Sequence, residues 1–152
     1  MKEAGLTQTN SEWDLIKDYF YRNGLNCAES TVRLFSSMGK YEIPKDLIKA
    51  MSGFGGGMQR GLTCGAVTAS VALLGLFTGR TEPNESREPS AQAVRTYLEE
   101  FEKRFGSLTC NKLKADFESK SDEMYEHCAK FVTGSVEIIT NILKQPSLGK
   151  IS

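Results

Sequence analysis

SGFGGGMQRGLTCGAVTAS, residues 52–70, places five glycines in its first ten residues and follows them with Cys64 and a run of small residues. Glycine adopts left-handed backbone angles and lets the main chain approach other groups closely, at an entropic cost. Behind the cysteine, Gly65, Ala69 and Ala72 recur at helical spacing on one face, so a second helix can pack closely there. We therefore expect a tight glycine-rich loop that leads into a closely packed helix.

Helical periodicity dominates on both sides of this stretch, and no alternating strand pattern with hairpin turns is present. Residues typical of helix starts and stops divide the chain, among them Asn26 and Glu29 in the spacing of a capping box. The pattern predicts an all-α fold, a single-domain helical bundle of about six helices with a glycine-rich loop. One expected helix carries Trp13 to Phe20, and others begin at Asn26, at Pro44, at Thr109 and near Ser121. Two more run from Thr63 to about Thr78 and from about Ser90 to Arg104.

Length and composition predict one domain, residues 1–152, with an exposed polar loop at 80–89, because 152 residues can bury a sufficient core without disulfides. Nineteen basic residues balance nineteen acidic ones, so no nucleic-acid partner is indicated. The longest apolar run, residues 66–77, is too short to span a bilayer, and no secretory signal is recognised. We expect a cytoplasmic protein that has no membrane partner and whose redox partner is unknown. Whether it forms a homo-oligomer stays open.

Three of the four cysteines, Cys27, Cys64 and Cys110, directly follow a residue that favours the N-cap of a helix. At a first helical position, free amides and the helix dipole favour an anion, which lowers the pKa of a thiol and makes its thiolate available. Cys128 instead lies on the apolar stripe of the last helix and is expected to face the core. We expect all four to meet in one pocket beside the glycine loop, as catalytic residues or as metal ligands.

The glycines themselves are candidate cofactor-binding residues, because their amides can donate hydrogen bonds to thiolates or to a metal centre. The candidates are Gly55, Gly56, Gly57, Gly61 and Gly65. The run follows a helix and lacks the Gly-Lys-Ser/Thr ending of a phosphate loop, so a nucleotide site is only weakly indicated. The alternative is a flexible surface connection.

Other interpretations of the cysteines stay open. A cysteine on an apolar face is commonly a small hydrophobic residue of the core. The chain contains no CxxC pair, so neither the usual zinc-finger spacing nor a thioredoxin-like site is present. The single histidine, His127, precedes Cys128. It is a fourth metal ligand or a base or, in the interpretation that we favour, a solvated side chain at the edge of the apolar stripe.

Four pieces of the sequence resemble the C-GCAxxG-C-C family, whose members are proposed to be redox-active. They are NCAES with Cys27, GFGGGMQRGLTCGAVTA with Cys64, FGSLTC with Cys110 and HCAKFV with Cys128, and the likeness extends over about residues 12–143. One position departs, because Ala69 stands where the family's CGAxxG ends in glycine. The resemblance implies redox activity or metal binding through these cysteines and does not define the reaction.

Three functions follow from these observations. The one slightly favoured is a site in which the four cysteines bind an iron–sulfur cluster or another soft metal, because three neighbouring thiolates would otherwise crowd negative charge. The second is a metal-free protein, an oxidoreductase or electron-transfer component, that cycles between dithiol and disulfide. The third is a helical binding or assembly module whose cysteines are structural.

Overall fold

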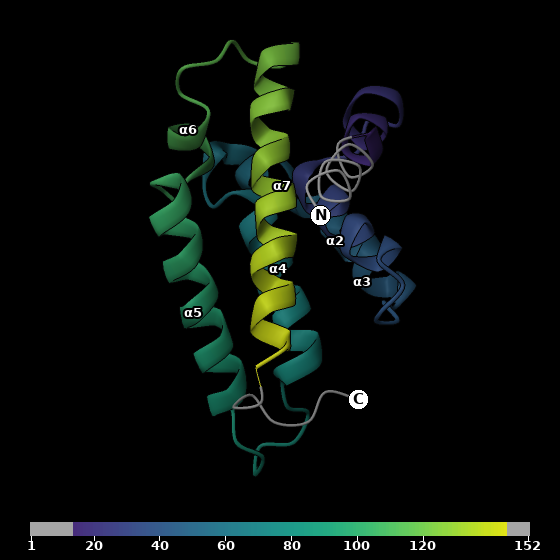
Figure 1. Ribbon diagram of the computed structural model, residues 1–152, viewed down its shortest axis with the longest axis vertical. Helices are drawn as coiled ribbons and strands as arrows, with labels where there is room; N and C mark the ends of the chain where they lie inside the picture. Colours follow the sequence, from purple (N-terminus) through teal and green to yellow (C-terminus); the bar gives the residue numbers. More distant parts are fainter. Residues whose placement is uncertain (1–13, 146–152) are drawn as a thin grey trace, which may run out of the picture.

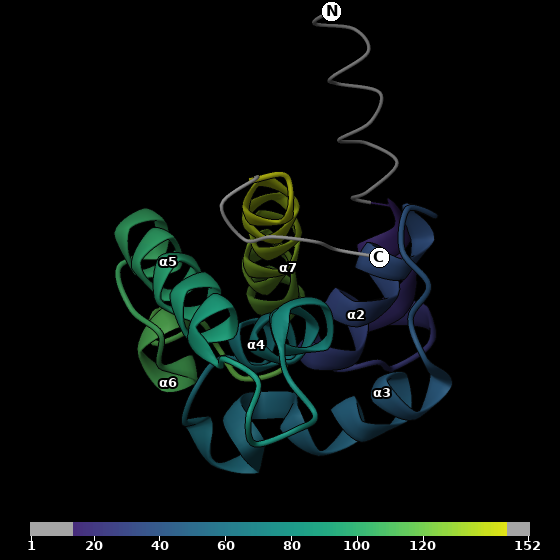
Figure 2. The same cartoon turned by 90° about the horizontal axis from the view of Figure 1, so that it is seen from below.

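The computed structural model describes residues 14–145, and this part of the chain is helical, with one isolated β-bridge and no strand. The predicted all-α fold is confirmed. Figures 1 and 2 show α4 in the middle, with α2, α5 and α7 around it and the short α3 beside α2. The helices are α2 (Cys27–Ser37), α3 (Lys45–Ala50), α4 (Gly65–Thr78), α5 (Glu88–Phe105), α6 (Cys110–Leu113) and α7 (Asp122–Leu143), with short helical turns η1 (Asp18–Arg22), η2 (Met51–Phe54) and η3 (Gly57–Gly61).

Helix α4 is apolar or small on nearly every side, which is the pattern of a helix buried in the middle of a fold. Its side chains at Ala66, Ala69, Leu73 and Leu74 are fully buried, and it packs against α2, α5 and α7. Of the three small residues predicted to share a face, Gly65 and Ala69 are buried and Ala72 is half-buried. None of the helices between residues 14 and 145 is both long enough and apolar enough to cross a bilayer.

Most helix ends lie where the capping residues predict them. Asn26 and Glu29 form the expected capping box at the start of α2, with Glu29 N donating to Asn26 Oδ1 at 2.8 Å. Ser121 caps α7 through a 3.1 Å hydrogen bond from Met124 N. The first expected helix includes Trp13, which lies outside the described residues.

Two predicted helix starts are displaced. Cys64, not Thr63, is the N-cap of α4, because the backbone of Cys64 is still non-helical, with a φ of −51° and a ψ of 135°, and the first helical residue is Gly65. Helix α5 begins at Glu88 rather than Ser90, since Pro89 is well suited to a first helical turn.

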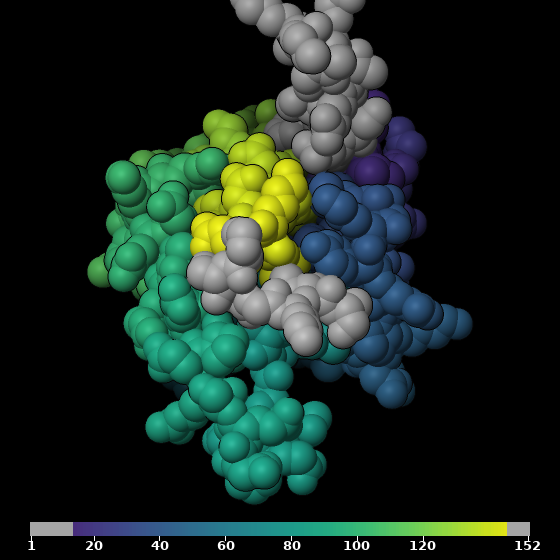
Figure 3. Space-filling view, turned by 60° about the horizontal axis from the view of Figure 1, so that its bottom comes forward, coloured from purple at the N-terminus to yellow at the C-terminus, as the bar shows by residue number. Residues whose placement is uncertain are grey.

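The connection between α4 and α5, residues 79–87, is exposed and protrudes as a teal projection in Figure 3. It corresponds to the predicted loop at 80–89 without its last two residues, which belong to α5. The guanidinium of Arg80 donates to the carbonyls of Pro83 at 2.7 Å and Glu85 at 2.9 Å. These bonds give the connection a defined conformation.

A buried hydroxyl pair joins α5 to α7. The Tyr97 hydroxyl is 2.7 Å from Ser135 Oγ and also donates to the carbonyl of Ala66 at 3.4 Å. Tyr97→Phe leaves Ser135 unpaired in the core and should lower the free energy of unfolding by about 1–2 kcal/mol, measured by urea denaturation. Adding Ser135→Ala should recover part of this loss, because no hydroxyl is then left unpaired. Strictly additive losses would contradict this account of the pair.

Candidate functional site

All four cysteines line one small cavity of about 20 Å³. It lies where the starts of α2, α4 and α6 meet the side of α7. Gly56, Gly57 and Gly65 line it as well, together with Lys114 and Phe131. The structure thus places the sequence-predicted cysteines around a common space, although it does not arrange them as metal ligands.

Backbone pairing holds Cys64 and Cys110 beside each other. Cys64 N donates to the carbonyl of Leu108 at 2.8 Å, and Cys110 N donates to the carbonyl of Leu62. These bonds flank the bridge between the residues that precede the two cysteines. A short antiparallel contact between distant segments therefore fixes one half of the site.

Two glycines, Gly57 and Gly65, allow the glycine-rich loop and the start of α4 to lie close to Cys110 and Cys27. Gly57 has a φ of +63°, and a Cβ there would lie 2.5 Å from Leu62 N and 2.7 Å from the Cβ of Cys110. At Gly65 a Cβ would lie 3.1 Å from the Cβ of Cys27. A side chain at Gly57 would therefore displace the segment that carries Cys110, and one at Gly65 would make a tight contact with Cys27.

Two further predicted glycines, Gly55 and Gly61, do not line the cavity. A Cβ at Gly55 would overlap the side chain of Asn26, which precedes Cys27, and a Cβ at Gly61 would overlap that of Asn111, which follows Cys110. Asn26 Nδ2 also donates to the carbonyl of Ser52 at 3.2 Å. These glycines accommodate residues adjacent to the cysteines.

The prediction that helix starts lower the pKa of three thiols is wrong. Burial raises the pKa of Cys64 to about 12, although the backbone amides of Ala66 and Val67 donate hydrogen bonds to its sulfur. Burial also raises the pKa of Cys110, against the opposing effect of the Lys114 ammonium. Desolvation disfavours a thiolate more than the few amides at a helix start favour it. The amides at Cys64 belong to α4 rather than to the glycine loop.

Cys27 and Cys128 form the most polarised pair in the site. Their thiols share a hydrogen bond that raises the pKa of Cys27 well above its usual range and lowers the pKa of Cys128. The Lys114 ammonium also lowers the pKa of Cys128, against the effect of burial. Cys128 is on the buried face of α7 as expected, with 8% of its surface exposed. It is nevertheless the thiol with the lowered pKa, while the pKa of Cys27 is raised.

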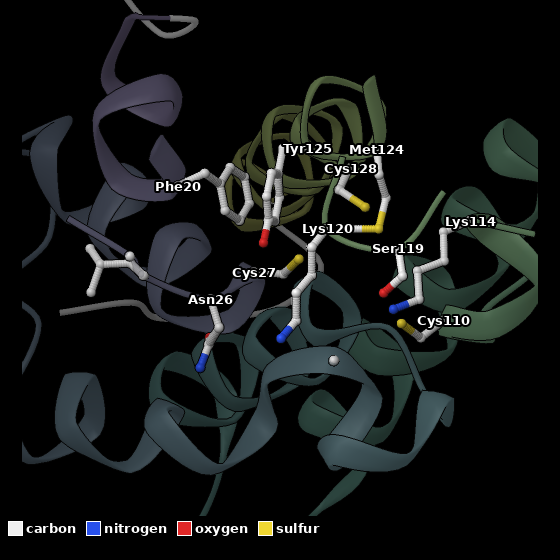
Figure 4. Close-up of a pocket in the computed structure, with 13 residues that line it drawn as sticks. Phe20, Asn26, Cys27, Cys110, Lys114, Ser119, Lys120, Met124, Tyr125 and Cys128 are labelled. Atoms are coloured by element: carbon white, nitrogen blue, oxygen red, sulfur yellow. The ribbon is translucent and has the colours of Figure 1, made fainter. Parts of the chain in front are cut away.

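A second, larger cavity of about 260 Å³ adjoins the first and is lined by three of the cysteines, Cys27, Cys110 and Cys128. Figure 4 shows these side chains directed into one space from α2, α6 and α7. The rings of Phe20 and Tyr125 stack with centroids 5.7 Å apart and both line the cavity. A small molecule in this space would meet the Cys128 thiol directly.

The predicted metal or cluster is not confirmed. Within residues 14–145, no group of three or more His, Cys, Asp or Glu side chains is arranged to hold a metal ion. The four-cysteine cavity of about 20 Å³ has room for little more than one water molecule, whereas a cluster contains several metal and sulfide atoms. The side chains as they stand do not fit such a group.

His127 is half-buried and lines neither of the two cavities. Its Nε2 lies 2.8 Å from the carbonyl of Leu113, and its ring stacks on Phe117 with centroids 4.3 Å apart. It therefore joins α7 to the end of α6. This joint positions Cys128 relative to Cys110.

Sequence analysis missed three residues around the larger cavity. Lys114 follows Cys110 by four residues and Tyr125 precedes Cys128 by three, so helical spacing carried a weak signal for both. Lys120 gave no such signal, because it lies in an irregular connection with a φ of +60°. All three line the cavity.

The fold and the site thus define the class of protein: a helical protein in which four cysteines line one cavity. The chain matches the family model described as "Putative redox-active protein (C_GCAxxG_C_C)" over residues 25–142, a span that contains all four cysteines. The chain belongs to this family. No significant match was found among curated proteins or among solved structures.

The close approach at Gly57 predicts a large difference between two neighbouring substitutions. Gly57→Ala combines a left-handed φ with a backbone clash and should lower the free energy of unfolding by about 3 kcal/mol or more. Gly56→Ala has a similar φ of +57° but open space around the new methyl, and should cost about 1 kcal/mol. Urea denaturation of both variants measures the difference. Equal losses would show that Gly57 is not a packing point.

The lowered pKa of Cys128 predicts its alkylation profile. A thiol reacts as thiolate, so the rate of Cys128 modification by iodoacetamide should rise with pH through a midpoint lower than that of an ordinary cysteine, while Cys64 stays unreactive until near its pKa of about 12. Lys114→Gln and Cys27→Ala each remove a group that favours the thiolate and should shift the Cys128 midpoint to higher pH. Peptide mapping by mass spectrometry follows each cysteine. A midpoint unmoved in both variants would contradict the assignment.

Proposed function

We propose that this protein carries out thiol–disulfide exchange through Cys27 and Cys128. The observation that carries the proposal is the hydrogen bond between their thiols, which favours the thiolate on Cys128 and the proton on Cys27. An attacking thiolate beside a protonated partner is the arrangement that exchange requires. Membership of a family described as redox-active supports the same class of function.

The exchange balances in two steps. The Cys128 thiolate attacks one sulfur of a substrate disulfide, forms a mixed disulfide and expels the other sulfur as a thiolate, which takes the proton of Cys27. The Cys27 thiolate then attacks Cys128 Sγ and expels the second half of the substrate as a thiolate. Two electrons pass from the protein to the substrate, and the protein retains a Cys27–Cys128 disulfide. The reverse sequence oxidises a substrate dithiol.

Lys114 supports the first step by position and charge. Its ammonium hydrogen-bonds the Cys110 thiol and opposes the burial that raises the pKa of Cys110, and it helps to lower the pKa of Cys128. Because Cys27, Cys64 and Cys110 favour their protonated forms, the site does not hold three crowded thiolates. The charge argument that favoured a metal in the sequence analysis therefore does not apply to the metal-free protein.

The exchange predicts a specific product. Reduced protein treated with bis(2-hydroxyethyl) disulfide should lose two thiols and gain an intramolecular disulfide, which peptide mapping assigns to Cys27 and Cys128. Cys27→Ser should stop at a mixed disulfide on Cys128, seen as one added half of the reagent by mass spectrometry. Cys128→Ser should react at least about 10-fold more slowly, since it lacks the thiolate.

Cys110→Ser is the matched control, because Cys110 lines the same cavity but is outside the pair. It should still lose two thiols and form the same disulfide. Oxidation that joins only separate molecules, or that joins other cysteines in the wild type, would overturn the proposal. Under the structural-module hypothesis, substitutions of the pair would alter stability alone.

The metal hypothesis is tested on the same protein purified without oxygen. Thiol–disulfide exchange predicts colourless protein with four titratable thiols by absorption and elemental analysis. The purified protein could instead contain stoichiometric iron or another soft metal, and each of the four single cysteine substitutions could abolish that metal content. This result would overturn the exchange and assign the function to a metal centre.

A further inference from the structure

The charge of the larger cavity points to the kind of molecule that reaches Cys128. We propose that this cavity accepts a small anionic disulfide, one that carries a carboxylate or a similar anion a few bonds from its sulfur atoms. The inference rests on the proposed exchange at Cys27 and Cys128 and names the substrate class of that site.

Apart from the Cys128 thiolate of the proposed exchange, the charged side chains in the cavity walls are positive. Lys114 and Lys120 both line the cavity, and the lining residues of the described chain include no Asp or Glu. Asp116 and Glu118 belong to the same connection but do not line the cavity. Charges of one sign in a concave site concentrate ligands of the opposite sign.

The backbone at Lys120 is an independent sign of function. Lys120 is the third residue of a turn closed by Ser121 N donating to the carbonyl of Glu118 at 3.1 Å, and its φ is +60°. Glycine is the residue that this turn position favours, since a side chain there is strained. Strain of this kind persists where the side chain serves a site, and here the strained residue brings an amine to the cavity.

The shape and the apolar wall limit the ligand further. A volume of about 260 Å³ lies just below the range of about 300–1,000 Å³ of pockets for drug-sized ligands. Phe20 and Tyr125 lie side by side and Met124 also lines the cavity, while the amine of Lys114 lies beside the Cys110 sulfur in Figure 4. A lining that combines apolar side chains with two amines suits a short methylene chain that ends in an anion.

Three disulfides of similar size test the charge preference. They are 3,3′-dithiodipropionate, a dianion; bis(2-hydroxyethyl) disulfide, which is neutral; and cystamine, a dication. The rate of thiol loss from the reduced full-length protein is measured at pH 7 for each and divided by its rate with free 2-mercaptoethanol, which removes intrinsic reactivity. We expect the order dianion, neutral, dication, with the dianion favoured over the neutral reagent by about 10-fold at low ionic strength and less in high salt.

Variants of Lys120 separate the effect of its charge on the reaction rates from the effect of its backbone conformation on stability. Lys120→Gly should lower the dianion-to-neutral ratio by about 3- to 10-fold, while the urea midpoint stays equal or rises because glycine relieves the strained φ. Lys120→Arg keeps the charge and should keep the ratio. Lys45→Gln, an exposed lysine of α3 outside the cavity, is the matched control and should leave both the ratio and the rate unchanged.

The outcomes distinguish the two proposals. Equal normalised rates for the three reagents, or an unchanged ratio in Lys120→Gly, would overturn the anionic substrate while leaving the Cys27–Cys128 exchange intact. Failure of every reagent to form the Cys27–Cys128 disulfide would overturn the proposed function itself. A faster reaction with a disulfide-linked dimer of the peptide Asp-Cys-Glu than with the small dianion would assign the anionic disulfide to a polypeptide and overturn the small-molecule assignment.

Discussion

The close contact of the glycine-rich segment with the starts of α2 and α6 is the constraint on which the site depends. A side chain at Gly57 would overlap the backbone of Leu62 and the Cβ of Cys110, and one at Gly65 would press against Cys27. With glycine at both positions, three cysteines from distant parts of the sequence reach one cavity. Helix α7 adds the fourth, because it packs against both α2 and α4.

Gathering four thiols in so small a space determines their ionisation. Burial and mutual repulsion disfavour more than one negative charge, so the protons are distributed unequally among the sulfurs. The hydrogen bond from Cys27 and the ammonium of Lys114 both favour the charge on Cys128. The result is a pair of thiols with opposite pKa shifts, lowered at Cys128 and raised at Cys27, which is a property of the assembled site and of no single helix start.

The sequence predicts what depends on neighbouring residues and misses what depends on distant contacts. The capping box of Asn26 and Glu29 and the cap at Ser121 are local patterns, and both are present in the structure. The bridge between Thr63 and Thr109, 46 residues apart in sequence, was not predicted, because such pairing leaves no local signature. The identity of the thiolate was missed for the same reason, since it is set by a contact between α2 and α7.

The same electrostatic coupling links the exchanging pair to a third thiol. The negative charge of Cys128 is one cause of the raised pKa of Cys110, and Lys114 opposes it. In the proposed exchange, oxidation to the Cys27–Cys128 disulfide removes that charge, while Lys114 stays beside Cys110. The pKa of Cys110 must then fall, because a repulsive charge is lost and an attractive one is retained. Cys110 is thus more readily ionised in the oxidised protein than in the reduced one, at the edge of the cavity where a substrate disulfide or dithiol would lie.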